Sequence, residues 1–431
     1  MRKSILLFSI VIKALCFVML FSGCKKDSPA KQPVPATQAP LIVGFSPDIA
    51  GIGYTVTING SIFIPDTSKD IVSFNGVQSI CTSATNTQLT ANVPIGAASG
   101  NISVVTNNQK SVSSSALQIK TLTVTTIAGS GELGHFDGPA LIASFGSPEN
   151  AIPDRKGNYY ITDPYNHKIR KLTPDGTVST YAGGNYGFTN GDIGTALFGQ
   201  PYDIAFDKAG NMYVTDYADN NIRKITPGGI VSTFAGDSLG NYGSVDGTGN
   251  NARFFSPAGI VIDRNDNIFV VDVFNSSIRK ITPAGVVTTL AGSDSPGFAD
   301  GTASSASFQN PYYVALDSND NLYVADDFNG RIRKVTQTGV VTTIASLNHP
   351  LGITIDRGGD IWVTDIDQRI DMITPAGMLY TLAGNQADLK TVDGVGIYAS
   401  FGGPHGIKID SGGALIVVDN NTNKIRKITI Q

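Results

Sequence analysis

A repeated motif runs through the C-terminal part of the chain and limits what it can fold into. The motif is a hydrophobic residue, two variable residues and a proline, followed by a short β-like run; the prolines are Pro148, Pro201, Pro257, Pro311, Pro350 and Pro404. Successive prolines lie 53, 56, 54, 39 and 54 residues apart. In every copy two aspartates stand nine residues apart, as Asp154 and Asp163 do in the first. Repeats of about this length are typical of solenoids and propellers, in which each unit packs on the next.

Each copy holds up to four β-like runs that are separated by Gly, Asn, Asp and Pro turns. In the second copy the runs span residues 203–206, 212–215, 221–226 and 229–234. Four antiparallel strands repeated six times predict a six-bladed β-propeller. The sixth copy ends at Gln431 one strand short, and residues 122–130 repeat the sequence of the missing strand. We therefore expect the N-terminal strand to complete the sixth blade and close the ring, which removes exposed sheet edges.

The repeat also resembles a known family. Residues 211–216, 221–224 and 231–236 (NMYVTD, NIRK and VSTFAG) are similar to an NHL repeat, and the resemblance covers residues 121–431. NHL families include extracellular teneurin-like propellers, protein-binding and RNA-binding propellers, and a few enzymes such as the peptide-amidating lyases. The resemblance therefore implies the fold without selecting one function.

A second domain precedes the propeller. Residues 40–120 contain short alternating runs with turn signals every 8 to 12 residues, which predicts a β-sandwich. The segments FSP at 45–47, VTING at 56–60 and VSFNG at 72–76 resemble an immunoglobulin-like IPT/TIG domain. Such a domain is usually a spacer or a binding module. The fold class is thus all-β, an immunoglobulin-like sandwich followed by a six-bladed propeller.

The first residues have the layout of a bacterial lipoprotein signal. Arg2 and Lys3 precede an apolar run over 5–21, and a Ser-Gly-Cys sequence ends at Cys24. We expect residues 1–23 to be removed, Cys24 to carry lipid, and residues 24–39, rich in Pro, Ala, Gln, Lys and Ser, to form a flexible linker. The alternative is a membrane span, for which a run broken by Lys13 is short. The expected location is the outer membrane facing the cell surface, with a periplasm-facing orientation left open.

Charge and cysteine content limit the kinds of site and partner that we expect. The mature chain would keep only Cys81 besides the lipidated residue, which leaves no disulfide and no cysteine-type zinc site. Residues 121–431 carry 22 Lys and Arg against 31 Asp and Glu. A propeller with this excess of acids is a poor phosphate binder, so we expect no nucleic-acid partner. The Ile-Arg-Lys triplets recur in five blades and predict structural pairs between arginine and the strand-terminal aspartate.

Positions that differ between the copies are the candidates for ligand contacts, because one ligand rarely needs six identical contacts. The residues directly after the prolines are Glu149, Tyr202, Ala258, Tyr312, Leu351 and His405, and the next residues are Asn150, Asp203, Gly259, Tyr313, Gly352 and Gly406. In propellers these positions begin the innermost strand and approach the central channel. We expect a polar ligand site there, formed by Glu149, Asn150, Tyr202, Asp203, Tyr312, Tyr313 and His405. A solvated channel without a ligand is the alternative.

An enzyme in the channel is the alternative from a different class. Relatives among the amidating lyases are expected to place zinc-binding histidines directly after the proline in several blades, whereas this chain offers only His405. One histidine does not make a three-ligand zinc site, so we assign no catalytic residue, no metal ligand and no cofactor. Lactonase-like propellers hold a channel metal with acidic and amide groups. Glu149, Asn150 and Asp203 are imperfect candidates for this, which keeps a channel calcium and a lactonase-like or lyase-like activity open.

The fifth copy departs most from the others. It lacks the Asn/Asp-Gly insertion that precedes the other blades, and its triplet reads Ile370-Asp371-Met372. The short spacing predicts a notch between the fourth and fifth blades. Phe274 and Phe328, which align with Tyr165, lie beside it by loop position. Exposed aromatic rings next to Asn and Asp suit sugar rings or a protein partner; a random scatter of surface aromatics is the alternative.

Together these features predict a lipoprotein that binds rather than catalyses. The combination resembles cell-envelope lipoproteins of Bacteroidota, some of which accompany glycan-uptake systems. The resemblance implies an extracellular glycan or an envelope protein as the partner, with the lipid on Cys24 as the contact with the membrane. The alternative binding function that involves no glycan is a scaffold that holds partner proteins through the loop face.

Overall fold

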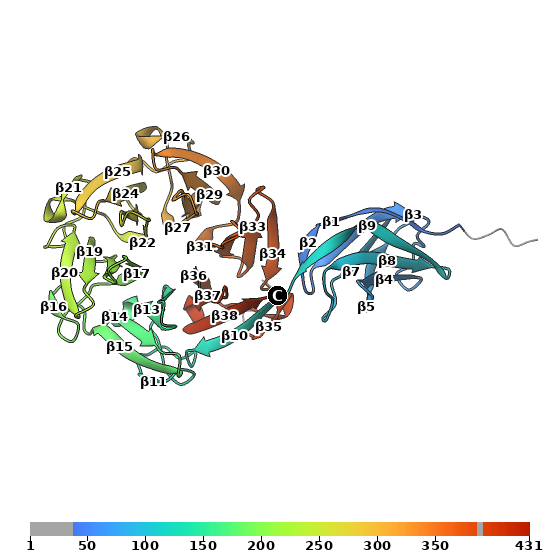
Figure 1. Ribbon diagram of the computed structural model, residues 1–431, viewed down its shortest axis with the longest axis horizontal. Coiled ribbons are helices and arrows are strands. Elements are labelled where there is room, and N and C mark those ends of the chain that lie inside the picture. The colour runs from blue at the N-terminus through green and yellow to red at the C-terminus, as the bar shows by residue number, and fades with distance from the viewer. Residues whose placement is uncertain (1–37, 386–390) are drawn as a thin grey trace, which may run out of the picture. The chain divides into compact units, whose positions relative to one another are not determined.

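The computed structural model describes residues 38–385 and 391–431, and residues 39–431 form one compact unit. The regular structure is almost entirely β, apart from six short 3-10 turns in the described part, which confirms the predicted fold class (Figure 1). In this part no helix is long and apolar enough to cross a membrane. The predicted signal peptide, Cys24 and most of the predicted linker lie outside the described residues.

The first domain is a β-sandwich of two sheets. One sheet has the order β1-β3-β7-β6 and the other β2-β9-β8-β4-β5. The strands are β1 (Leu41–Ser46), β2 (Ile49–Gly51), β3 (Thr55–Ser61), β4 (Asp70–Phe74), β5 (Val77–Ser79), β6 (Cys81–Ala84), β7 (Gln88–Asn92), β8 (Gly100–Thr106) and β9 (Gln109–Lys120). Alternate residues such as Val56, Ile58, Val72 and Phe74 point inward and are buried between the sheets, as the period-2 pattern predicts.

The second domain is a propeller whose innermost strands surround the centre of the ring (Figure 1). The strands of each blade are given from the inside outward. Blade one has β12 (Ala151–Pro153), β13 (Tyr159–Asp163), β14 (Lys168–Leu172) and β15 (Thr177–Gly183), and blade two has β17 (Pro201–Phe206), β18 (Met212–Asp216), β19 (Asn221–Ile225) and β20 (Ile230–Ala235). Blade three has β22 (Pro257–Ile262), β23 (Ile268–Asp272), β24 (Ser277–Ile281) and β25 (Val286–Gly292). Blade four has β27 (Pro311–Leu316), β28 (Leu322–Asp326), β29 (Arg331–Val335) and β30 (Val340–Ser346), and blade five has β31 (Pro350–Ile355), β32 (Ile361–Asp365), β33 (Ile370–Ile373) and β34 (Leu379–Ala383). Blade six has β36 (Pro404–Ile409), β37 (Leu415–Asp419), β38 (Lys424–Ile430) and β10 (Leu122–Ala128).

The ring closes as predicted. Strand β10 pairs antiparallel with β38, with Leu122 opposite Ile430, and supplies the outermost of the four regular strands of blade six. Five blades carry a further two-residue strand on their outer edge; these are β11 (Gly138–Pro139), β16 (Gly191–Asp192), β21 (Gly247–Thr248), β26 (Gly301–Thr302) and β35 (Gly394–Val395). Each comes from the Asn/Asp-Gly insertion and covers an edge that would otherwise be unpaired.

The constant nine-residue spacing of the aspartates has a structural reason. The first aspartate builds the hairpin turn between the innermost strand and the next: Asp154 accepts hydrogen bonds from the backbone N–H of Lys156 and Asn158 at 2.8 and 2.9 Å. The second aspartate ends the next strand, where Asp163 accepts the N–H of Gly146 at 2.7 Å. A four-residue turn followed by a five-residue strand therefore separates the two carboxylates.

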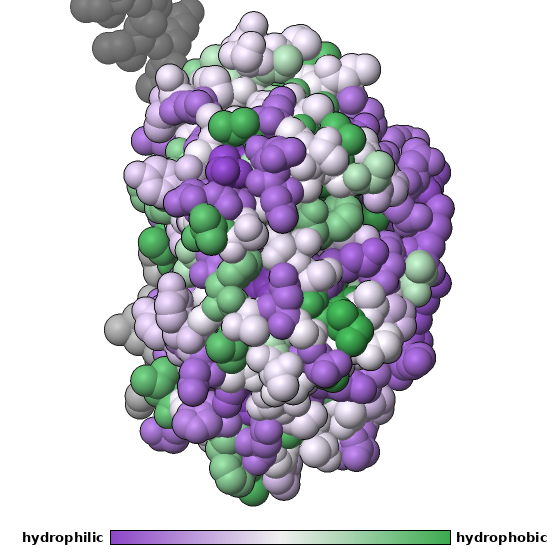
Figure 2. Space-filling view, turned by 90° about the vertical axis from the view of Figure 1, so that its left-hand side faces the viewer, coloured by the Kyte–Doolittle hydropathy of each residue, from purple (hydrophilic) through white to green (hydrophobic). Residues whose placement is uncertain are grey.

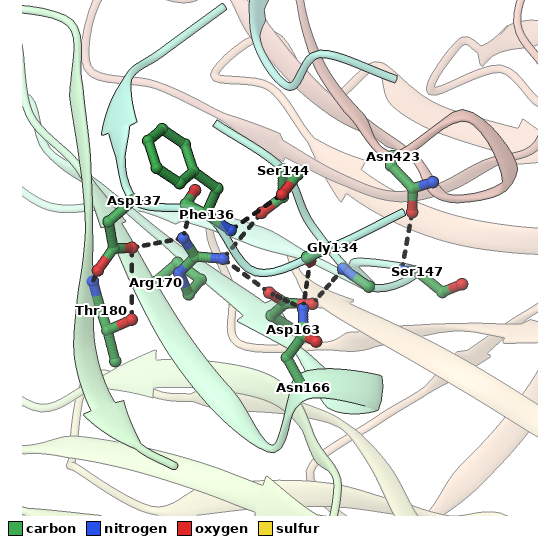
Figure 3. A network of polar contacts seen from close by, with 11 residues as sticks. Gly134, Phe136, Asp137, Ser144, Ser147, Asp163, Asn166, Arg170, Thr180 and Asn423 are labelled. Carbon is green, nitrogen blue, oxygen red and sulfur yellow. Dashed lines mark hydrogen bonds and ion pairs between the residues drawn. The ribbon is translucent and has the colours of Figure 1, made fainter. Parts of the chain in front are cut away.

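The strand-terminal aspartate also holds a buried arginine. In blade one the Arg170 guanidinium donates to Asp163 and to the carbonyl oxygen of Ser144, each at 3.0 Å, and to Asp137 of the rim loop (Figure 3). Arg170 and its counterparts Arg223, Arg279, Arg333 and Arg426 are fully buried. Each guanidinium lies 4.9 to 5.3 Å from the ring centroid of the motif phenylalanine of its blade. The predicted structural role of the triplet is confirmed.

Blade five lacks three parts of this network and keeps the strand-terminal aspartate, Asp365. The rim loop is absent, the motif phenylalanine is Leu347, and the arginine position holds Asp371. In the other blades the guanidinium bonds to the rim loop and packs on the motif phenylalanine. Without the rim loop, the arginine and the phenylalanine lose this shared packing. Arg369 now pairs with the strand-terminal Asp365 at 2.8 Å.

The sandwich covers the edge that the missing loop leaves on β34. Tyr380 of β34 donates its hydroxyl to Asp48, and Tyr54 donates to the carbonyl oxygen of Gly384 at 2.9 Å. Gly51 of β2 approaches so closely that a Cβ atom there would lie 2.7 Å from the carbonyl oxygen of Leu382. At its outer edge, the notch expected beside blade five is therefore covered by the sandwich.

The opposite part of the rim is polar. Figure 2, which faces the left-hand side of Figure 1 and thus the region of β16, β20 and β21, shows hydrophobic residues scattered among polar ones. Scattered surface apolar residues are normal for a folded domain, so this view gives no sign of a broad apolar docking surface there.

Candidate functional site

A pocket of about 510 Å³ lies where the innermost strands begin, and we call it the mouth pocket. Five residues that directly follow blade-opening prolines line it, namely Glu149, Tyr202, Tyr312, Leu351 and His405. The propeller thus brings together side chains that lie up to 256 residues apart in the chain. This volume falls within the range of small-molecule sites.

Glu149 and His405 form the polar centre of the mouth pocket. The Nδ1 atom of His405 lies 2.9 Å from Oε2 of Glu149, and Asn420 donates to Oε1 at 3.1 Å. Burial alone would lower the pKa of His405, but the charge and hydrogen bond of Glu149, with Asp419 and Asp327 farther off, raise it above its usual value. The contact with Glu149 therefore favours the protonated form of His405.

Two tyrosines, Tyr202 and Tyr312, line the mouth pocket, and two more, Tyr217 and Tyr313, pack against Tyr202. The ring of Tyr202 stacks on Tyr217 with 5.1 Å between centroids and on Tyr312 at 6.3 Å, and it lies 5.8 Å from Tyr313. Burial, followed by neighbouring phenols and acids, raises the pKa of Tyr312 well above its usual value, so its hydroxyl stays neutral. These side chains combine flat apolar faces with hydroxyl groups that can hydrogen-bond.

The ring contacts continue outward from the tyrosines. Tyr217 meets Phe274 at 6.3 Å, Phe274 meets Phe255 at 4.9 Å, and Phe255 stacks on Tyr242 at 4.5 Å. Phe274 and Tyr242 are 44% and 67% exposed. The aromatic surface therefore extends from the mouth pocket toward the rim of blade three.

Three of the predicted site residues lie behind the pocket wall. Asn150 and Asp203 are fully buried, and the Asn150 side chain donates a 2.8 Å hydrogen bond to Asp203. Tyr313 is also buried, and its hydroxyl donates a hydrogen bond to the carbonyl oxygen of Glu149. Asp203 further accepts the N–H of Ile260 at 3.1 Å and faces the Lys408 ammonium at 3.6 Å. These residues support the channel wall and do not line the mouth pocket.

The same contacts decide whether Glu149, Asn150 and Asp203 fit a channel calcium. Calcium takes six to eight oxygen ligands. Here the Asp203 carboxylate already accepts hydrogen bonds from the Asn150 side chain and from the backbone N–H groups of Ile204 and Ile260. The Lys408 ammonium lies beside it at 3.6 Å. These residues do not fit a calcium ion. In the described ranges no group of three or more His, Cys, Asp or Glu residues could hold a metal.

The three aromatic residues predicted in the loops, Tyr165, Phe274 and Phe328, lie apart from one another. Phe274 belongs to the ring contacts above. Phe328, 55% exposed, packs edge-on against His349, whose Nδ1 lies 2.8 Å from Asp327, a residue that lines the mouth pocket. Tyr165, in the 3-10 turn η1 (Pro164–Asn166), is 70% exposed and lies outside the mouth pocket.

Sequence reasoning missed the position directly after the strand-terminal aspartate. It holds Tyr217, Asp327, Ile366 and Asn420 in blades two, four, five and six. Asp327 and Ile366 line the mouth pocket, Tyr217 stacks on Tyr202, and Asn420 holds Glu149. This position also varies between the copies, so the comparison of copies that found Glu149 would have found it.

Comparison with known proteins agrees with both domains. The family model of the IPT/TIG domain matches residues 40–121, and that of the NHL repeat matches residues 401–428. A curated relative, the Arabidopsis thaliana protein SUPPRESSOR OF QUENCHING 1, chloroplastic, is 28% identical over 319 residues, which is 71% of this chain. The match spans 27% of the length of that relative.

Solved structures from Bacteroides share the fold of both domains. A structural genomics protein of unknown function from Bacteroides thetaiotaomicron has a TM-score of 0.56 at 18% identity, covering 92% of this chain and 99% of its own. Auxiliary nutrient binding proteins from Bacteroides thetaiotaomicron and Bacteroides ovatus have TM-scores of 0.55 and 0.54 at 17% and 16% identity, covering 91% of this chain and 98% of theirs. The chain is therefore an IPT/TIG domain joined to a six-bladed NHL-type β-propeller.

Proposed function

We propose that this chain is a binding module of the cell envelope whose mouth pocket holds a neutral extracellular glycan. The observation that carries the proposal is the composition of the pocket, in which the stacked rings of Tyr202 and Tyr312 face the polar pair Glu149 and His405. A sugar ring has an apolar face that packs on aromatic rings and hydroxyl groups that hydrogen-bond to carboxylates. Pockets with apolar walls and a few placed polar groups are typical of ligand sites.

Two further features support a glycan over a nucleic acid. The propeller has 31 acidic against 22 basic side chains, which disfavours a phosphate-rich polymer. The exposed rings of Phe274 and Tyr242 continue the aromatic surface beyond the pocket, as a ligand longer than one sugar would require. Two solved proteins of the same fold carry the description auxiliary nutrient binding protein, a role consistent with this proposal.

The anchor is part of the same proposal. The sequence around Cys24 predicts a lipid-bearing cysteine, which would hold the module at the outer membrane facing the cell surface. Metabolic labelling of the expressed chain with a radioactive fatty acid tests this. We expect incorporation into the wild type and none into Cys24→Ala, whereas labelling of both would contradict the anchor.

Isothermal titration of the purified protein with cellohexaose, xylohexaose and mannohexaose tests the glycan. We expect saturable binding of at least one, weakened about tenfold in Tyr312→Ala, since that change removes a stacking surface. Tyr165→Ala, which removes an exposed tyrosine outside the pocket, is the matched control. Absence of binding to every hexaose, or equal losses in both variants, would contradict the proposal and direct the search to an envelope protein.

A channel enzyme is the second candidate, and one observation favours it. A histidine held by a carboxylate at the edge of a pocket is an arrangement used in general acid–base catalysis, and His405 with Glu149 has it. Hydrolysis of glucono-1,5-lactone, followed by pH-stat, tests this candidate. Turnover by the wild type that is lost in Glu149→Gln would support an enzyme; no turnover, or equal turnover in both, would remove these residues from a catalytic role.

A further inference from the structure

A second and larger pocket lies at the other end of the channel. It measures about 770 Å³ and is lined where the innermost strands of blades one to four end, by residues such as Pro153, Phe206, Ile262 and Leu316. Because these strands begin at the mouth pocket, the second pocket opens on the opposite face of the propeller. We call it the basal pocket.

The floor of the basal pocket is apolar and aromatic. Tyr160 lies edge-on to Tyr181 with 4.9 Å between centroids and to Phe206 at 5.5 Å. Ile262 and Leu316, both half-buried, extend this surface toward the channel. Such a floor favours a flat apolar body over a fully hydroxylated one.

Basic side chains line the basal pocket on three successive blades. They are Arg155, Lys156, Lys208 and Arg264, all exposed and all in hairpin turns. Arg264 is paired with Asp320 at 3.0 Å, and Lys208 donates to the carbonyl oxygen of Arg264. In the described part of the chain, the side chains of Arg155 and Lys156 form no ion pair and no hydrogen bond, so both remain available to a ligand.

Five acids also line the basal pocket: Asp320 is paired with Arg264, Asp266 accepts the backbone N–H of Lys208 at 3.3 Å, and the other three hold their own turns. The carboxylates of Asp154, Asp207 and Asp263 accept hydrogen bonds from backbone N–H groups of their own turns and from an asparagine side chain. They are directed into the turns that they build. The cations, by contrast, stand at the exposed ends of the turns.

We propose that the basal pocket binds a small amphipathic carboxylate. Its flat apolar body lies on the Tyr160 and Phe206 rings, and its carboxylate meets Arg155 and Lys156 at the rim. An arginine can take a carboxylate through two parallel hydrogen bonds. A bare polyanion would use the cations but leave the apolar floor unfilled. This site is separate from the mouth pocket and does not depend on the function proposed there.

Calorimetry with 2-naphthoate and the uncharged 2-naphthamide tests the basal pocket. Both probes have the same ring body, and the charged carboxylate of one is a neutral carboxamide in the other. We expect the wild type to bind naphthoate at least about tenfold more tightly, because hydrogen bonds to charged groups contribute more than neutral ones. The double variant Arg155→Gln with Lys156→Gln should lose this preference. Arg357→Gln, which changes the same turn position in blade five outside the pocket, should keep it.

Three results would overturn the proposal. They are equal affinity of the wild type for the two probes, an unchanged preference in the double variant, and no saturable naphthoate binding. Tyr312→Ala separates the two sites, because loss of naphthoate binding in that variant would place the probe in the mouth pocket and not in the basal one. Since both exchanged side chains are exposed, the double variant should fold like the wild type, which thermal unfolding checks.

Discussion

Replacing Asp371 with asparagine should stabilise the protein at neutral pH. Asp371 occupies the position that a buried arginine holds in the other blades, and only 2% of it is exposed. Its Oδ1 atom has no hydrogen-bond partner within the described residues. Burial, and next the charge of Asp365, raise the pKa of Asp371 to about 7. The folded protein thus keeps a proton there that the unfolded chain releases near pH 4.

The sign and size of the effect follow from this difference. From about pH 4 to pH 7 the folded state binds more protons than the unfolded state, so the free energy of unfolding falls as the pH rises. One pKa unit corresponds to about 1.4 kcal/mol, so the Asp371 charge costs up to about 4 kcal/mol above pH 7. Asparagine keeps the shape of the side chain and carries no charge, so the variant should avoid this cost.

Urea unfolding of wild type and Asp371→Asn at pH 5 and pH 8 measures the effect. We expect the variant to be more stable than the wild type at pH 8 and the difference to shrink at pH 5, where Asp371 is protonated. Asp192→Asn, an exposed aspartate on the rim, is the matched control and should leave the pH dependence unchanged. An equal pH dependence in wild type and Asp371→Asn would refute the reasoning.

Three further predictions concern the blades, the domain contact and the mouth pocket. Arg333→Met should cost about 3 to 5 kcal/mol in urea unfolding, because Asp326 stays buried without its counter-charge; a loss below 1 kcal/mol would contradict this. Gly51→Ala should cost about 1 to 3 kcal/mol in unfolding and speed proteolysis between the domains, because its Cβ meets Leu382; Gly44→Ala, with open space around it, is the control. Glu149→Gln should lower the pKa of His405, followed by NMR, because the variant removes the main carboxylate that opposes the effect of burial; an unchanged pKa would show that Glu149 does not govern it.

Most of the fold could be predicted from local sequence signals. The spacing of Asp154 and Asp163 encodes one turn and one strand, and its sixfold recurrence gives the number of blades. The strand copy at 122–130 predicts the closure that β10 makes with β38. These features depend on neighbouring residues, because turns and alternating strands are set over short stretches of chain.

The candidate site was predictable only in part. The residues after the prolines could be identified because they break the repeat, and five of them meet in the mouth pocket. The same rule also selected Asn150 and Asp203, which the structure buries in the channel wall. Neighbouring positions on a strand point to opposite faces, and sequence alone does not say which face a blade turns toward the channel.

The sequence by itself therefore determined the four-stranded repeat unit, the number of blades and the strand that closes the ring. Only the tertiary structure decided that Glu149 meets His405, that Tyr202 stacks on Tyr312, and that the sandwich covers β34. These contacts join residues more than a hundred positions apart. They form because ring closure and edge coverage bring distant segments together, and a pattern of local periodicity carries no information about such distances.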